Sequence, residues 1–73
     1  MPKNNLRVIS PDKDTSLRLK EILEKEFGSV PGFAVSIDLK ETNIVHIEKE
    51  HLNFLSFLDV CHICEDLGCH VIS

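Results

Sequence analysis

The chain has 73 residues, which is room for one domain, 1–73, and we expect its first residues, 1–4, to form a flexible terminus. The formal net charge is −4, and there is neither Trp nor Tyr. Both features argue against nucleic acid as a partner, because phosphate-binding surfaces need clustered Lys and Arg and single-stranded platforms need stacking aromatics. No signal peptide or membrane-spanning stretch is visible, and an odd number of cysteines favours free thiols. The sequence therefore predicts a cytoplasmic protein without a membrane partner.

The first third of the chain has the pattern of a strand followed by a helix. Leu6–Ile9 is a short β-branched run and is predicted as a strand. Ser10–Asp14 interrupts it and offers three alternative helix caps, at Ser10, Asp12 and Asp14. A helix is predicted from there to about Phe27, because apolar residues recur every three or four positions. Gly28 is predicted to stop this helix in a left-handed conformation.

The middle of the chain has the pattern of a β-hairpin. Phe33–Leu39 alternates strictly, with Phe33, Val35, Ile37 and Leu39 predicted to face a core and the residues between them to face outward. Lys40–Asn43 is the predicted turn, with Asn43 at its positive-φ position. The next strand is predicted at Ile44–Glu48, with Val45 and Ile47 pointing inward.

A second helix and a final strand complete the chain. The helix is predicted from about His51 to Leu67, ended by Gly68, and the strand at Cys69–Ile72. The order β-α-β-β-α-β predicts an α+β, ferredoxin-like sandwich. Right-handed crossovers then place two helices on one face of a four-stranded antiparallel sheet with strand order 4-1-3-2. The residues expected to be buried together are Leu23, Val35, Ile37, Val45, Ile47, Phe57, Val60 and Cys64.

The sheet face turned away from the helices is the first candidate binding surface. Alternation predicts a mixed surface there, with several aliphatic side chains among charged ones. A small core gains stability when such a face is covered, so we expect a protein partner or a homodimer. The residues predicted to contact the partner are Ile44, His46, Glu48, His70 and Ile72.

The outer side of the second helix is the alternative contact surface. At about 100° per residue, Leu55 and Leu58 fall within the polar arc of this helix. They serve either as extra packing against the first helix or as the centre of a partner contact.

The cysteines and a neighbouring histidine are the metal-ligand candidates: Cys61, Cys64, Cys69 and His70. Thiolates and imidazoles are the ligands that zinc and copper prefer. Cys61 and Cys64, however, are spaced within a helix, and Cys64 falls in its apolar arc, where a thiol acts as a small hydrophobe. We therefore expect buried structural cysteines and neither a metal nor another cofactor.

Two families share this predicted strand order. Heavy-metal-associated domains carry a metal-binding C-x-x-C between the first strand and the first helix, where Ser10–Thr15 has no cysteine. The segment Pro11–Leu17 resembles the Pro-Asp-x-Pro-Gly-x-Leu motif of ACT-type regulatory domains, which implies an amino-acid ligand. The glycine of that motif is Thr15 here. RNA-recognition domains present stacking aromatics on their central strands, where this chain has His46. The sequence therefore does not favour an RNA-recognition domain.

No catalytic motif is recognisable in the chain. His46 and Glu48 lie two apart on one strand face, as a base and the group that orients it could, but no nucleophile or phosphate-binding loop accompanies them. The sequence thus favours a small non-enzymatic interaction or regulatory module acting through protein contacts. The alternative is a small ligand- or metal-binding domain.

Overall fold

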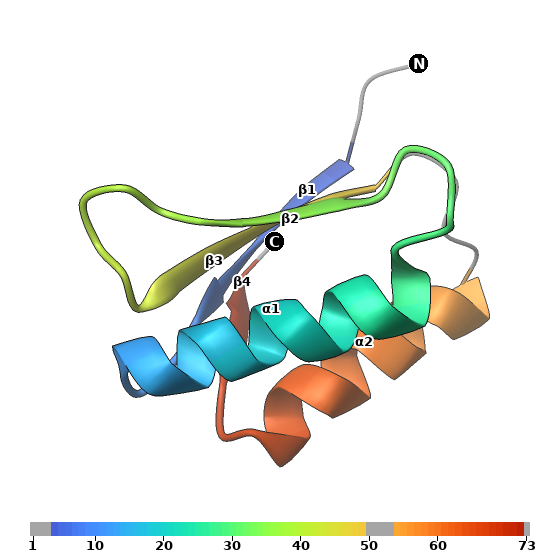
Figure 1. The fold of residues 1–73 in the computed structure, drawn as a ribbon. Coiled ribbons are helices and arrows are strands. Elements are labelled where there is room, and N and C mark those ends of the chain that lie inside the picture. Colours follow the sequence, from blue (N-terminus) through green and yellow to red (C-terminus); the bar gives the residue numbers. More distant parts are fainter. Residues whose placement is uncertain (1–3, 50–53, 73) are drawn as a thin grey trace.

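The computed structural model describes residues 4–49 and 54–72 and has the predicted ferredoxin-like arrangement (Figure 1). The elements are β1 (Asn4–Ile9), α1 (Lys13–Phe27), β2 (Ala34–Ile37), β3 (Ile44–Lys49), α2 (Phe54–Asp66) and β4 (His70–Ile72). The four strands form one antiparallel sheet ordered β2-β3-β1-β4, which is the predicted order read from the other edge. Both helices lie on one side of this sheet (Figure 1).

A short polar segment connects β1 to α1 and selects one of the three predicted caps. Asp12 has an extended backbone, with φ −159°, and its carboxylate accepts a hydrogen bond of 2.7 Å from the backbone N–H of Thr15. This satisfies one of the free N–H groups in the first helical turn. The hydroxyls of Ser10 and Ser16 are buried and bond to each other, while the Ser10 backbone N–H donates to Asn43 O at 2.8 Å. The start of α1 is therefore tied to the β2–β3 turn.

The C-terminal end of α2 is a Schellman motif. Gly68 has φ +78°, its N–H donates to Glu65 O, and the Cys69 N–H donates to Cys64 O, both at 2.9 Å. A left-handed residue at this position is usually glycine because it has no Cβ. The motif reverses the direction of the chain within a few residues, so that β4 begins directly after α2.

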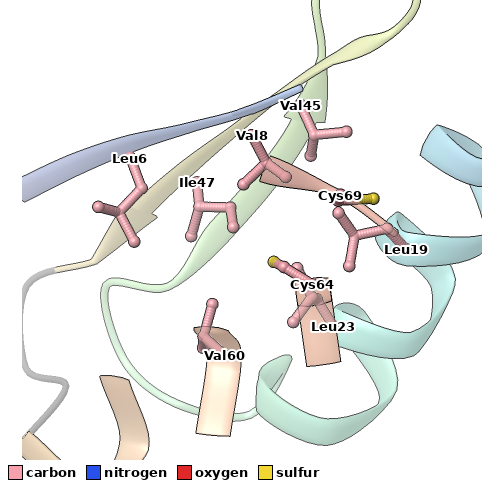
Figure 2. Close-up of a cluster of buried hydrophobic side chains, with 9 residues drawn as sticks. All are labelled: Leu6, Val8, Leu19, Leu23, Val45, Ile47, Val60, Cys64 and Cys69. Atoms are coloured by element: carbon pink, nitrogen blue, oxygen red, sulfur yellow. The ribbon is translucent and has the colours of Figure 1, made fainter. Parts of the chain in front are cut away.

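The core lies between the sheet and the two helices (Figure 2). The predicted inward faces of β3 and α2 are confirmed, since Val45, Ile47, Val60 and Cys64 are fully buried. Three residues predicted for the core, Val35, Ile37 and Phe57, are only partly buried and pack against it. The buried apolar set is Leu6, Val8, Leu19, Leu23, Val45, Ile47, Val60, Cys64 and Cys69.

The prediction for Leu39 is wrong, because β2 ends at Ile37 and Leu39 is 98% exposed. Asp38 causes the early ending. Its carboxylate accepts hydrogen bonds from the backbone N–H groups of Lys40 and Glu41, at 3.0 and 2.9 Å, and so begins the turn two residues before the predicted one. Alternation no longer assigns faces once the strand has ended.

Two backbone predictions and one boundary also need correction. Gly28 is right-handed, with φ −61°, and its N–H continues the helical pattern by donating to Glu24 O. Asn43 does not have a positive φ, because only Gly32 and Gly68 do among the described residues. Asn4, expected in the flexible terminus, belongs to β1. The predicted start of the second helix, near His51, lies outside the described residues.

Candidate functional site

The candidate site is the sheet face turned away from the helices, which we call the open face. It follows from the pairing register, because the alternate residues of β1 and β3 are buried in the core and those of β2 and β4 are partly buried against it. On β1, Leu6 and Val8 are buried, so the alternating residues Asn5, Arg7 and Ile9 lie on the open face. The strand residues of the open face are Asn5, Arg7, Ile9, Ala34, Ser36, Ile44, His46, Glu48, His70 and Ile72.

Three isoleucines form the apolar part of the open face. Ile9 on β1 and Ile44 on β3 are directly opposed in the register, and Ile72 on β4 is diagonal to Ile9. Directly opposed side chains lie about 4.5–5.5 Å apart at Cβ, so Ile9 and Ile44 form one continuous surface. Ile9 is 38% exposed, and Ile44 and Ile72 are half-buried. The predicted contacts Ile44 and Ile72 thus share a patch with Ile9, which was not among the predicted contact residues.

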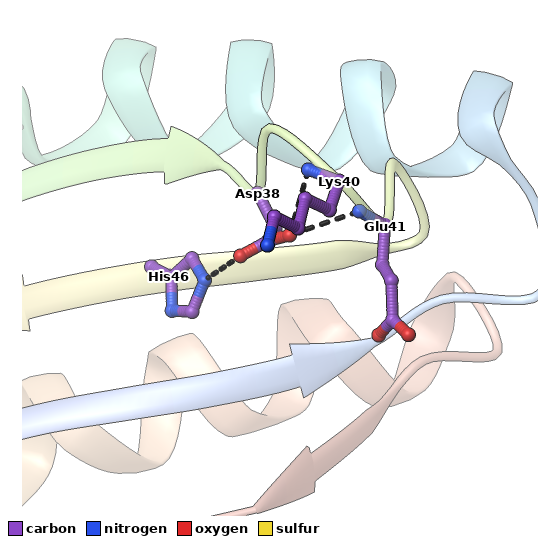
Figure 3. Close-up of polar contacts among 4 residues, drawn as sticks. All are labelled: Asp38, Lys40, Glu41 and His46. Carbon is purple, nitrogen blue, oxygen red and sulfur yellow. Dashed lines mark hydrogen bonds and ion pairs between the residues drawn. The ribbon is translucent and has the colours of Figure 1, made fainter.

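His46 lies on the open face and is held by Asp38 (Figure 3). Its Nε2 is 3.0 Å from Asp38 Oδ1, and the ring N–H donates when the carboxyl is ionised. The hydrogen bond from His46, followed by those from the Glu41 and Lys40 backbone, lowers the pKa of Asp38 from 3.8 to about 2. Asp38 thereby joins the turn, the edge strand and the open face, and it carries a negative charge at neutral pH.

The His46–Asp38 pair has the chemistry of a base with an orienting carboxylate, but among the described residues no hydroxyl or thiol is hydrogen-bonded to the His46 ring. Its register neighbours on the open face are Ser36 and Arg7, and neither side chain has a bond to His46. A shallow open depression lies elsewhere, at the N-terminal end of α1. It is lined by Asp12, Asp14, Thr15, Leu17, Arg18 and Glu21. The segment that resembles the ACT motif is thus a helix cap beside a solvent-open surface.

The cysteine candidates are distributed through the core and along α2. Cys64 is fully buried, and burial, followed by the neighbouring Cys69 and Cys61, raises its pKa from 9.0 to about 12. Burial likewise raises the pKa of Cys69 and, together with Glu65, that of the half-buried Cys61. His70 is exposed on the open face. Within residues 4–49 and 54–72, no three His, Cys, Asp or Glu side chains gather closely enough to hold a metal ion.

The alternative surface on α2 is described only in part. Leu58 is 37% exposed, and its neighbours Asp59 and His62 are also exposed. The side chain of Leu55 lies outside the described part of the structure. The Lys49 Nζ lies 4.6 Å from the centroid of the Phe57 ring, and this cation–π contact joins the end of β3 to α2.

The fold and the open face define a small ferredoxin-like α+β domain with one uncovered sheet surface. No known family, curated protein or solved structure gives a significant match to the chain. Within the part of the chain that is described, no helix is both long and apolar enough to cross a bilayer.

Proposed function

We propose that this domain is a non-enzymatic interaction module, and that its open face binds a protein surface. The observation that carries the proposal is the patch formed by Ile9, Ile44 and Ile72, which extends from the turn end of the two central strands over a sheet face that neither helix covers. Contiguous exposed apolar side chains rimmed by polar ones are typical of protein-contact sites. The core is small, so covering this face adds apolar burial that the 73-residue chain cannot supply alone.

The composition of the rim favours protein over other partners. Arg7 is the only Lys or Arg among the strand residues of the open face, so a polyphosphate backbone finds no basic cluster there. Glu48 and Asp38 add negative charge to the same face. A mixed rim around an aliphatic centre suits a protein surface with charges of both signs. The cytoplasm is the compartment we propose, consistent with three free thiols.

Site-specific photo-crosslinking in the producing cell tests this function. A benzoylphenylalanine at Ser36, which is exposed on the open face, should give a discrete crosslinked product. The same residue at Asp59, exposed on α2, is the matched control and should not give that product. Adding Ile44→Glu should remove the Ser36 product, because a carboxylate in an apolar contact is costly. Equal or absent crosslinking at the two positions would contradict the proposal.

A further inference from the structure

The charges of the open face are divided between its two halves. Asp38, which follows β2, and Glu48 on β3 lie on one half together with His46, whereas Arg7 on β1 and His70 on β4 lie on the other. Lys40 and Glu41, in the turn beyond Asp38, have opposite charges that offset each other. The isoleucine pair Ile9–Ile44 spans the boundary between the halves. Each half has one histidine, so the half with Asp38 and Glu48 is acidic and the half with Arg7 is basic.

We propose that the protein bound by the open face is a second copy of this chain, packed face to face about a two-fold axis that runs parallel to the strands between β1 and β3. This proposal rests on the proposed function and names the partner of that same surface. The rotation stacks β3 of one copy on β1 of the other. Ile44 then faces Ile9 of the second copy, and Asp38 faces its His70.

The charge division selects this axis over the other two-fold arrangement. An axis perpendicular to the strands would stack each strand on its own counterpart and bring the acidic halves together. The proposed axis places the acidic half of each copy on the basic half of the other, which is the self-complementarity that a closed dimer requires. Arg7 then faces His46 of the second copy, between its Asp38 and Glu48. Aligned sheets cross at about 30°, which displaces contacts on β1 and β3 less than those on the outer strands.

The dimensions of the sheet set the expected strength. Four strands spaced about 4.8 Å apart, with a longest strand of six residues, give a footprint of roughly 400 Å². A standard stable interface buries about 800 Å² of accessible surface per partner, so this contact falls at the weak end. The dimer should therefore be reversible and should dissociate on dilution through the micromolar range.

Sedimentation velocity of the purified chain over a concentration series tests the second copy directly. The sedimentation coefficient should rise from monomer to dimer with concentration, and Ile44→Glu should weaken the association at least tenfold. Leu58→Glu places the same charge on an exposed residue of α2 and should leave the association unchanged. Circular dichroism of each variant establishes that it is folded.

Substitutions at His70 test the orientation and do not touch the core, because this side chain is exposed. At low salt, His70→Lys should tighten the dimer by between about twofold and tenfold, because the lysine ammonium is positively charged at neutral pH and faces Asp38 of the second copy. His70→Asp should weaken the dimer by a similar factor. Equal effects of the two changes would overturn the proposed axis.

The failure of this proposal differs from the failure of the proposed function. A chain that stays monomeric up to millimolar concentration overturns the second copy. If crosslinking from Ser36 persists in the cell and yields a product other than a doubled chain, the open face binds a different protein. If both results are negative, the interaction function itself is wrong.

Discussion

His46 and Asp38 are joined by a 3.0 Å contact between Nε2 and Oδ1, which connects the central strand β3 to the residue that ends the edge strand β2 (Figure 3). The same carboxylate accepts the two backbone N–H groups that begin the turn. One side chain therefore shapes the hairpin and gives the open face its negative charge beside β2.

The titration of Asp38 should depend on His46. Its pKa, about 2 in the folded chain, is below the ordinary 3.8, so the ionised form is favoured by folding. The stability that it contributes is complete above about pH 4 and should be lost as the pH falls through about 2. In His46→Ala the pKa of Asp38 should rise towards 3.8, without reaching it because the Glu41 and Lys40 N–H bonds remain. Carboxyl chemical shifts recorded by NMR against pH measure both values.

Ser36→Ala is the control for this titration, since Ser36 lies opposite His46 in the register and has no bond to Asp38. Its substitution should leave the Asp38 titration unchanged. An Asp38 pKa that stays at about 2 in His46→Ala would show that the turn N–H groups alone hold the carboxylate.

Leu23 and Leu39 form a matched pair for testing the core. Leu23 is fully buried and Leu39 is 98% exposed, although both are leucines within the predicted apolar pattern. Leu23→Ala should reduce the free energy of unfolding by about 2–5 kcal/mol, because it removes apolar contacts and leaves a cavity. Leu39→Ala should change it by less than about 0.5 kcal/mol. Chemical denaturation of both variants gives the comparison, and a similar loss in both would mean that Leu39 is packed in solution.

The sequence predicted the strand order and the inward faces of β3 and α2 because strong periodicity extends over whole elements. Val45, Ile47, Val60 and Cys64 were all assigned to the core on that basis and are buried. The pattern failed at Leu39, where hydrogen bonds from the Lys40 and Glu41 backbone N–H groups to the Asp38 carboxylate ended the strand while the apolar alternation continued. Periodicity describes burial within an element and contains no information on where a hydrogen-bonded turn begins.

The sequence predicted which residues lie on the open face, but the contacts among them could be assigned only from the strand register of the structure. Ile44, His46, Glu48, His70 and Ile72 were all placed on it by alternation alone. The contact of His46 with Asp38 and the opposition of Ile9 and Ile44 depend on how β1, β2 and β3 align. The local pattern of the sequence does not specify this alignment, because shifting one strand by two residues along its neighbour keeps every side chain on the same face of the sheet.

The three thiols should react in an order set by burial. Thiolates are the reactive form, and burial raises the pKa of Cys64 to about 12 and also raises that of Cys69. Both should therefore resist alkylation in the native chain at about pH 8. Cys61 is half-buried and should be modified first. Mass spectrometry after timed iodoacetamide treatment identifies the order, with a denatured sample as the control in which all three react. Rapid native labelling of Cys64 would contradict its place in the core.

The stability of the turn at Gly68 should depend on whether the residue there has a Cβ, and not on how large its side chain is. Gly68 has φ +78°, and no atom lies within 4 Å of the position that a Cβ would occupy, so an added methyl group meets open space. The cost of Gly68→Ala is then a backbone cost of about 1–2 kcal/mol for a left-handed non-glycine residue. Gly68→Asn has a larger side chain but tolerates this conformation, so it should lose less stability than Gly68→Ala. Thermal and chemical denaturation of the two variants decide the order. A greater loss in the asparagine variant would mean that space, and not the backbone angle, limits the residue between α2 and β4.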